Sequence, residues 1–244
     1  MIELREQDVH IWWLSLPVAH SDSVRRRLWS ILSAEERERC GRFRFERDRA
    51  QYLVSHALVR LSLSEYEGID PASWVFAKNP WGKPIVQGPE GASAVLFSLS
   101  HTEGLVGCAI SHSQVGLDVE HLNRRHTDWS GISHLAMRPS ELSYVTSVAP
   151  HERIRAILRL WTLKESYLKA KGQGLSTNIS SLEFDLTKDQ PCLNFSPDNG
   201  RESGLWHFFE FQPSSEHLMA LSVRRDPFEG VCPVLIDAGA LVLQ

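Results

Sequence analysis

Apolar residues recur along this chain with a period of two in some stretches and with helical spacing in others. Val9 to Leu14 has the pattern of a strand, and Asp22 to Leu32 carries apolar residues at helical spacing. Ser33 followed by Glu36 is a capping-box pattern, which predicts that a second helix begins at Ala34. The chain is therefore expected to open with a strand and two helices.

A longer helix is predicted from about Asp48 to Glu65, with Arg47, Arg49 and Arg60 at its surface. Its buried stripe consists of Tyr52, Leu53, Ala57, Leu58, Leu61 and Leu63. The sequence Asn79-Pro80-Trp81-Gly82-Lys83-Pro84 follows, and its two prolines and its glycine predict a constrained loop. This loop separates the helix from the strands that come next.

The rest of the chain combines short strands with one long helix. Three runs of strand character predict a meander, Val95 to Ser100, Leu105 to Ile110 and Val115 to Glu120. The longest helix is predicted at Pro150 to Lys171, and it ends at Gly172. Further strands are predicted at Leu182 to Leu186, Trp206 to Phe211 and Met219 to Arg224.

This order of elements predicts an α+β fold rather than a parallel doubly wound sheet. The chain has 244 residues, more than the roughly 100 to 150 of a common single domain. We therefore expect two halves, residues 1–112 and 113–244, that meet in the polar turn from Ser111 to Gln114.

Composition narrows the class of protein. The net charge of −4 and the pI near 6.3 give no global electrostatic reason to bind nucleic acid or an anionic membrane. The four cysteines are widely spaced without a C-x-x-C pair, which predicts reduced thiols. The N-terminus lacks a signal-peptide pattern, and no apolar run reaches 18 residues. We expect a cytoplasmic protein.

The strand from Val115 to Glu120 alternates apolar and other residues, so Asp118 and Glu120 share a face. Same-face neighbours on a strand lie roughly 7 Å apart, close enough for two carboxylates to approach one hard cation. An amphipathic edge strand with its acids in water would give the same pattern. The hexapeptide alone leaves both interpretations open.

A third carboxylate comes from the long helix. In the run from Trp161 to Lys169, Glu165 and Lys169 are four residues apart and lie on one helix face. They could form a simple stabilising ion pair. They could also place a carboxylate and a cation beside Asp118 and Glu120, and Mg²⁺ held by carboxylates and phosphate oxygens is typical of phosphoryl chemistry.

Ser100 and His101 adjoin in the run from Phe97 to Thr102. A Ser/His nucleophile is disfavoured, because adjacent residues of a strand point to opposite faces and no G-x-S-x-G motif occurs. A histidine that donates to a phosphate and a purely structural histidine both remain possible. The alternating charges from Glu35 to Arg49 are most typical of a solvated helix face with ion pairs.

Taken together and in order, six segments resemble phosphopantetheinyl transferases of the surfactin-synthetase-activating (Sfp-like) type. Each segment alone is weakly specific, but their order and spacing cover most of the chain. The segments are Arg37-Glu38-Arg39-Cys40-Gly41-Arg42-Phe43, the helix from Asp48 to Arg60, Gly82-Lys83-Pro84, Phe97 to His101, Gly116-Leu117-Asp118-Val119-Glu120, and Trp161 to Lys169 with its continuation to Ser176.

The resemblance implies a monomeric pseudo-dimer of two similar α/β halves, with coenzyme A and Mg²⁺ (or Mn²⁺) in the cleft between them. It implies that Asp118, Glu120 and Glu165 bind the metal. The residues implied around the phosphates of coenzyme A are Lys83, Ser100, His101 and Lys169, with Arg39, Arg47 and Arg49 facing the phosphate on the ribose. Where some relatives carry a basic residue before Arg39, this chain has Glu36.

The implied reaction moves 4′-phosphopantetheine from coenzyme A to a serine of an apo acyl- or peptidyl-carrier protein of fatty-acid, polyketide or nonribosomal-peptide synthesis. Glu165 is the candidate base and Lys169 the candidate donor to the leaving phosphate. The carrier would dock on residues 124–144, through Trp129, Leu135, Met137 and Leu142, although these residues would equally suit core helices. A Mg²⁺-dependent phosphohydrolase and a catalytically silent coenzyme A-binding module are the alternatives.

Overall fold

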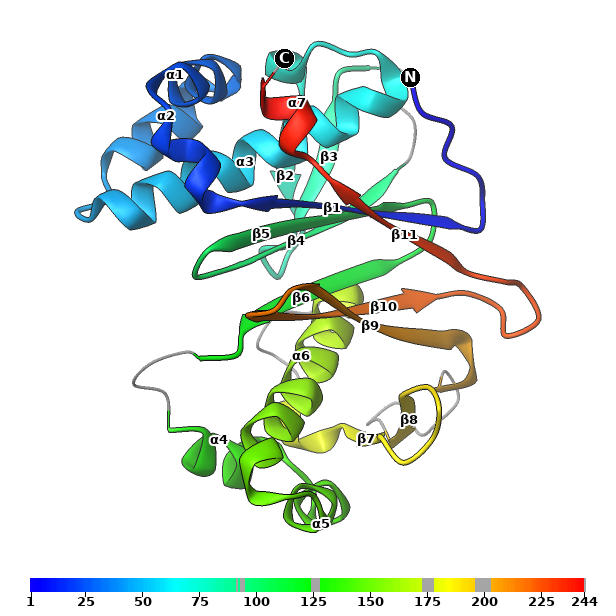
Figure 1. Ribbon diagram of the computed structural model, residues 1–244. Helices are drawn as coiled ribbons and strands as arrows, with labels where there is room; N and C mark the ends of the chain where they lie inside the picture. Colours follow the sequence, from blue (N-terminus) through cyan, green and yellow to red (C-terminus); the bar gives the residue numbers. More distant parts are fainter. Residues whose placement is uncertain (91, 93–94, 124–127, 173–177, 196–202, 244) are drawn as a thin grey trace.

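Two lobes lie one above the other in Figure 1, and each combines a β-sheet with one long helix. The computed structural model describes residues 1–90, 92, 95–123, 128–172, 178–195 and 203–243. Residues 173–176, the continuation of the last transferase-like segment, lie outside the described residues. So do residues 124–127, the start of the proposed docking stretch. The mixed α+β fold in two lobes agrees with the fold class expected from the sequence.

The first lobe is built on a four-stranded sheet in the order β11-β1-β5-β4. β1 runs antiparallel to β5 and parallel to β11. The strands are β1 (Asp8–Ser15), β4 (Leu96–Thr102), β5 (Leu105–Ser111) and β11 (Cys232–Asp237). Alternate residues of β1 and β5 face the helices of this lobe or the second lobe, so both faces of these strands are buried.

Helices α1 (Asp22–Ile31), α2 (Ala34–Gly41) and α3 (Glu46–Glu67) cover the outer face of this sheet (Figure 1). The capping box predicted for α2 is present, because Ser33 Oγ accepts from the amide of Glu36 and the Glu36 carboxylate accepts from the amide of Ser33. The constrained loop after α3 is the turn of a hairpin between β2 (Val75–Lys78) and β3 (Pro84–Gly88), which the sequence pattern did not predict.

The C-terminal segment returns to the first lobe. β11 pairs with β1, and the short helix α7 (Gly239–Leu243) packs near α1. Both ends of the chain therefore lie in the upper lobe of Figure 1. A single cut between residues 112 and 113 does not describe the lobes, since residues 232–243 belong with the N-terminal half in space.

The second lobe contains a three-stranded antiparallel sheet in the order β6-β10-β9, and α6 lies across it. Its strands are β6 (Val115–His121), β9 (Trp206–Ser214) and β10 (His217–Arg224), and its helices are α4 (Trp129–Ala136), α5 (Pro139–Ser147) and α6 (Arg153–Lys171). A small hairpin of β7 (Glu183–Asp185) and β8 (Cys192–Phe195) completes it. Gly172 ends α6 with φ +64°, as its position predicts.

The predicted three-stranded meander is wrong for its last strand. β4 and β5 pair with each other, but β6 leaves their sheet and pairs with β10, about a hundred residues later in the chain. The local pattern indicates a strand and carries no information about a partner so distant. Apolar residues of β1, β5, β6 and β10 form a shared core between the two sheets, and this core holds the lobes together.

Two further observations concern membrane-spanning helices and thiols. In the part of the chain that the structure describes, no helix is long and apolar enough to cross a membrane. All four cysteines are free thiols, two of them buried, as the spacing predicts.

Candidate active site

Asp118 and Glu120 lie on one face of β6 and point towards α6. Asp118 Oδ1 accepts a hydrogen bond from Lys169 Nζ at 2.7 Å, and Glu120 Oε1 accepts one from the indole of Trp161 at 3.2 Å. The two acidic residues are only 5% and 7% exposed. The shared face is therefore confirmed. β6 is indeed an edge strand, but the alternative that its acids lie in water is wrong.

Gly116 explains how β6 approaches α6 so closely. A Cβ at this position would lie 1.9 Å from the carbonyl oxygen of Ser166 and 2.3 Å from the amide nitrogen of Ala170. No side chain fits there, so only glycine permits this spacing. The close approach brings Asp118 within hydrogen-bond reach of Lys169.

Ser100 of β4 connects the first lobe to this pair. Its hydroxyl donates to Asp118 Oδ1 at 3.1 Å, and it accepts from Lys169 Nζ at 2.8 Å and from the amide of Val119 at 3.2 Å. A serine hydroxyl has one hydrogen to donate and two lone pairs, so its capacity is filled. Ser100, Asp118 and Lys169 thus form one polar junction between the lobes.

His101 follows Ser100 on β4, and its side chain is exposed. Gln51 Nε2 lies 3.0 Å from His101 Nδ1 and also donates to the carbonyl of Thr102 at 3.1 Å. Because an amide nitrogen only donates, Nδ1 accepts and the neutral ring carries its proton on Nε2. Partial removal from water and the charge of Lys169 lower the pKa of His101. The site therefore presents a neutral imidazole with an Nε2–H donor.

Glu165 lies one helical turn before Lys169. Burial and the negative charge of Asp118 raise the pKa of Glu165, and Lys169 opposes this effect. Within the described residues, the buried Oδ2 atom of Asp118 has no hydrogen-bond partner. A divalent cation would satisfy that oxygen and would lower the pKa of Glu165, so the donor set suits an oxygen-preferring metal.

The three carboxylates do not form a ready-made metal centre. Among the described residues, no three His, Cys, Asp or Glu side chains are grouped closely enough to hold a metal ion as they stand. Asp118 Oδ1 instead forms a salt bridge with Lys169 Nζ. Metal binding by Asp118, Glu120 and Glu165 therefore stays a prediction, and it requires some rearrangement of these side chains.

The loop of residues 79–84 is fastened to the C-terminal end of α6. Asn79 Nδ2 donates to the carbonyl of Gly172 at 2.8 Å, and Lys83 Nζ donates to the carbonyls of Val115 at 3.0 Å and Ala170 at 3.4 Å. Burial lowers the pKa of Lys83 to about 8. The loop thus carries a desolvated lysine to the same end of the cleft as Lys169.

Two cavities open at this junction. The first, of about 290 Å³, is lined by catalytic candidates and by the hairpin loop, including Trp81, Lys83, Ser98, Glu165 and Lys169. The second, of about 420 Å³, shares Pro84, Phe97 and Leu99 with the first and extends to Arg39, Tyr52 and His56. The two cavities therefore adjoin along the boundary of the first lobe.

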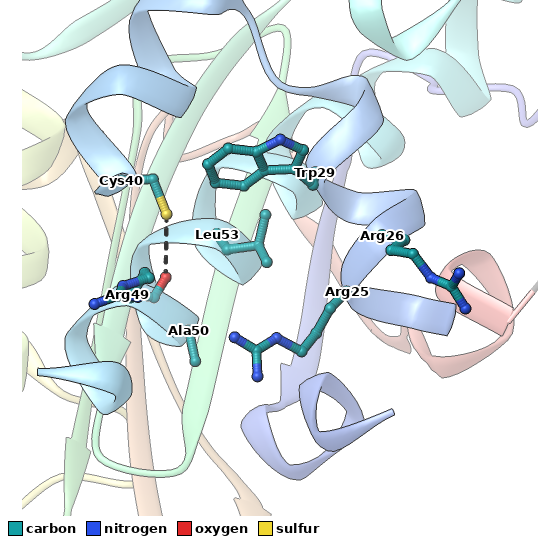
Figure 2. A pocket seen from close by; sticks show the side chains of 7 residues that line it. All are labelled: Arg25, Arg26, Trp29, Cys40, Arg49, Ala50 and Leu53. Carbon is teal, nitrogen blue, oxygen red and sulfur yellow. Dashed lines mark hydrogen bonds between the residues drawn. The ribbon is translucent and has the colours of Figure 1, made fainter. Parts of the chain in front are cut away.

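The three arginines predicted to face the ribose phosphate lie in different places. Arg39 lines the second cavity, with its guanidinium carbon 5.8 Å from the ring centroid of Tyr52. Arg49 instead lines a separate cavity of about 320 Å³ together with Trp29 (Figure 2). Arg47 is strongly exposed and pairs with its neighbour Asp48. Of the three arginines, only Arg39 thus lines one of the two cavities at the lobe junction.

Glu36, which stands in the position that is basic in some relatives, is fully engaged inside the protein. Arg60 Nε and His56 Nδ1 each lie 2.9 Å from a Glu36 carboxylate oxygen. Although burial alone would raise it, the hydrogen bonds from His56 and Ser33 and the charge of Arg60 lower the pKa of Glu36 to about 2. Arg60 is buried in this network, so the expectation that it lies at the helix surface is wrong.

The docking stretch proposed from the sequence is mostly core. Trp129 and Met137 are buried in the second lobe, and Leu142 packs against the same core. Leu135 is 79% exposed. The alternative of ordinary core helices is therefore confirmed for three of the four residues, and Leu135 remains as an exposed candidate.

Three residues at the site were not found from the sequence. They are Gln51, which orients His101, and Ser98 and Asn79, which bond across the lobes. Ser98 lies two residues before Ser100 on the same strand face, and this spacing is a usable signal. Gln51 and Asn79 carry no such signal, because their partners lie 50 or more residues away.

Comparison with known proteins identifies the family. Residues 21–113 match the model "4'-phosphopantetheinyl transferase, N-terminal", and residues 114–222 match "4'-phosphopantetheinyl transferase superfamily". The chain is 30% identical to the 4'-phosphopantetheinyl transferase HetI of Nostoc sp., over 91% of this chain and 90% of that protein. It is also 30% identical to a 4'-phosphopantetheinyl transferase of Bacillus subtilis, over 72% of this chain and 75% of that protein.

Among solved structures, a holo-(acyl-carrier-protein) synthase from Bacillus anthracis in complex with CoA (3',5'-ADP) aligns with 47% of this chain and 96% of that chain, at 19% identity and a TM-score of 0.40. The family assignment rests on the sequence relatives and the two family models, which together span both lobes. The chain belongs to the 4'-phosphopantetheinyl transferase family.

Proposed function

We propose that the junction between the lobes transfers the 4′-phosphopantetheine group of coenzyme A to a serine of an apo acyl- or peptidyl-carrier protein, with release of adenosine 3′,5′-bisphosphate. The observation that carries the proposal is the convergence of Ser100, Asp118 and Lys169 from two lobes, with Glu165 beside them. Membership of the transferase family supports the reaction class.

Coenzyme A would lie across the two adjoining cavities. Lys83 and Lys169, which line the first cavity, suit its pyrophosphate, because charged donors bind phosphate oxygens strongly. The Nε2–H of His101, which follows Ser100 on β4, offers a further donor outside the lining of the two cavities. Arg39 suits the phosphate on the ribose from the second cavity. For Arg47 and Arg49, support for this role comes from the family resemblance alone.

Asp118, Glu120 and Glu165 would hold Mg²⁺, or Mn²⁺, which has the same preference for oxygen ligands. Two observations support this assignment, the partnerless Oδ2 of Asp118 and the raised pKa of Glu165. The bound cation would supply positive charge to the phosphate oxygens where negative charge develops.

The chain's own residues account for the proton and the leaving group. Glu165, which lines the first cavity, takes the proton of the carrier serine as the general base. The serine oxygen forms a bond to the phosphorus attached to pantetheine, and the bond from that phosphorus to the departing adenosine bisphosphate breaks. Lys169 donates to the departing phosphate and stabilises its extra charge.

The partner assignments complete the proposal. The acceptor is a carrier protein, and fatty-acid, polyketide and nonribosomal-peptide carriers are all candidates. The protein acts as a monomer in the cytoplasm, without nucleic acid or membrane as a partner.

Mass spectrometry of an apo carrier domain incubated with the protein, coenzyme A and Mg²⁺ tests the transfer. We expect a gain of one phosphopantetheine at the carrier serine. Glu165→Gln should slow the gain by about 10²- to 10⁴-fold, because general base catalysis is lost. A chelator should abolish the gain. The matched control is Glu152→Gln, which alters an exposed glutamate far from the cleft and should leave the gain unchanged.

Two results would contradict the proposal. Binding of coenzyme A without modification of any carrier type would favour the silent binding module. Release of phosphate without an acceptor would favour the phosphohydrolase.

A further inference from the structure

β4 and β6 are edge strands of separate sheets, yet they lie side by side where the lobes meet (Figure 1). An edge strand leaves every second amide without a strand partner. Here, Ser98 Oγ accepts from the amide of Leu117 at 3.0 Å, and Ser100 Oγ accepts from the amide of Val119 at 3.2 Å. Two serine hydroxyls thus replace the carbonyl oxygens of a neighbouring strand.

These two hydrogen bonds bracket Asp118. The amides of the residues before and after it are both tied to β4, so the backbone that carries its carboxylate is held at two points. Ser100 additionally donates to the carboxylate itself. The Ser98 hydroxyl instead accepts from the backbone of β6, so Ser98 would act on Asp118 through the position of that strand.

The environment makes the Ser98 bond consequential. Ser98 and Leu117 are both buried, and an amide that loses its acceptor in such a place keeps the full cost of desolvation. Ser98 also lines the cavity that contains Glu165 and Lys169. A shift of β6 at Leu117 would therefore move Asp118 relative to Glu165 and Lys169 of α6.

We propose, on the basis of the proposed function, that Ser98 is a positioning residue for the metal site, because its hydroxyl fixes the segment of β6 that presents Asp118. Groups that orient a metal ligand without touching the metal affect affinity by about 10- to 100-fold when they are removed. Ser98 would belong to this class, and Ser100 would combine the same backbone contact with a direct contact to the ligand.

Titration of Mn²⁺ in the presence of coenzyme A, followed by electron paramagnetic resonance, tests this role without relying on turnover. Ser98→Ala should weaken Mn²⁺ binding by about tenfold or more. Ser98→Thr, which keeps the hydroxyl, should bind nearly as tightly as the unaltered protein. Ser111→Ala is the matched control, because Ser111 is a buried serine on the adjacent strand β5 and its hydroxyl also accepts a backbone amide, that of Ser113 at 3.1 Å.

The outcomes separate the two levels of the proposal. Equal Mn²⁺ affinity in Ser98→Ala and Ser111→Ala would overturn the positioning role. Failure of the unaltered protein to bind Mn²⁺ with coenzyme A would contradict the metal site of the proposed function itself. If Ser98→Ala does not fold, Ser98→Cys keeps the volume with a weaker acceptor and should show the same loss of affinity.

Discussion

Lys164 and Lys169 stand five residues apart on α6 and have opposite surroundings. Lys164 is fully buried, and its Nζ donates to Glu141 Oε2 at 2.6 Å and to the carbonyls of Ala136 at 2.7 Å and Leu182 at 2.9 Å. The Lys169 side chain is 32% exposed at the cavity, and its Nζ bonds Ser100 across the lobe junction and Asp118 within its own lobe. One lysine fixes the second lobe, and the other faces the site.

The difference shows how one sequence motif supplies both architecture and chemistry. The three acceptors of Lys164 come from the end of α4, from α5 and from the segment before β7, so this lysine joins three parts of the lobe. It has no route to a substrate. Lys169 keeps part of its surface in the cavity, beside an Asp118 oxygen that lacks a partner, so a ligand can change its pairing.

The largest effect should come from removing Lys164. Lys164→Met should lower the free energy of unfolding by about 3–5 kcal/mol, because Glu141 would be left as a buried charge without its partner. Urea unfolding measures the loss. The double variant Lys164→Met, Glu141→Leu should recover part of it, since no buried charge then remains. A loss below about 1 kcal/mol would place this pair with exposed salt bridges instead.

Lys169→Gln should separate activity from stability. The kcat/KM for transfer should fall by about 10²- to 10³-fold, as expected when one donor to a developing negative charge is removed. Its urea midpoint should shift less than that of Lys164→Met, because the side chain is partly hydrated. Steady-state kinetics with a carrier protein measure the first quantity. The comparison between the two lysines breaks down if Lys169→Gln loses stability but transfers normally.

Lys83 should give the smallest effect, visible as a pH dependence. Its pKa of about 8 means that the free protein loses this cation as the pH rises through 8, so kcat/KM for coenzyme A should fall by about tenfold per pH unit above that value. Lys83→Arg should remove the decline, because guanidinium stays charged. An unchanged profile in Lys83→Arg would assign the decline to another group.

Deprotonation of Lys83 should lower kcat/KM but raise the free energy of unfolding. The folded pKa of Lys83 lies below its ordinary value, so its charged form destabilises the folded state at neutral pH. The free energy of unfolding should therefore rise as the pH increases from about 8 to about 10.4, the ordinary lysine pKa. Lys83→Met should lack this rise when unfolding is followed across the same pH range.

Much of the fold and of the site was predictable, because the signals are local. Strand and helix periodicity predicted β1, α1, α3, β4, β5, β6, α6, β9 and β10 to within a few residues. The alternation in β6 predicted that Asp118 and Glu120 share a face, and helical spacing placed Glu165 near Lys169. These inferences needed only the residues of one element.

The misses involve partners that are distant in sequence. β11 pairs with β1 from the other end of the chain, and its mixture of exposed and half-buried positions gives a weak strand pattern. Arg60 was expected at the helix surface, but it is buried and donates a hydrogen bond to Glu36. This partner lies 24 residues away in the sequence, so the helix pattern could not indicate it. Arg39 of α2 and Arg49 of α3 have similar sequence contexts, yet the two side chains line different cavities.

The sequence by itself determined the elements, the transferase-like motifs and the types of residue available for phosphate and metal chemistry. The tertiary structure decided which of them meet. Gly116 lets β6 contact α6, and the hydroxyls of Ser98 and Ser100 join β6 to β4 across two sheets. The physical reason is that periodicity records which face of an element is buried, whereas a hydrogen bond between lobes depends on positions that the whole fold sets together.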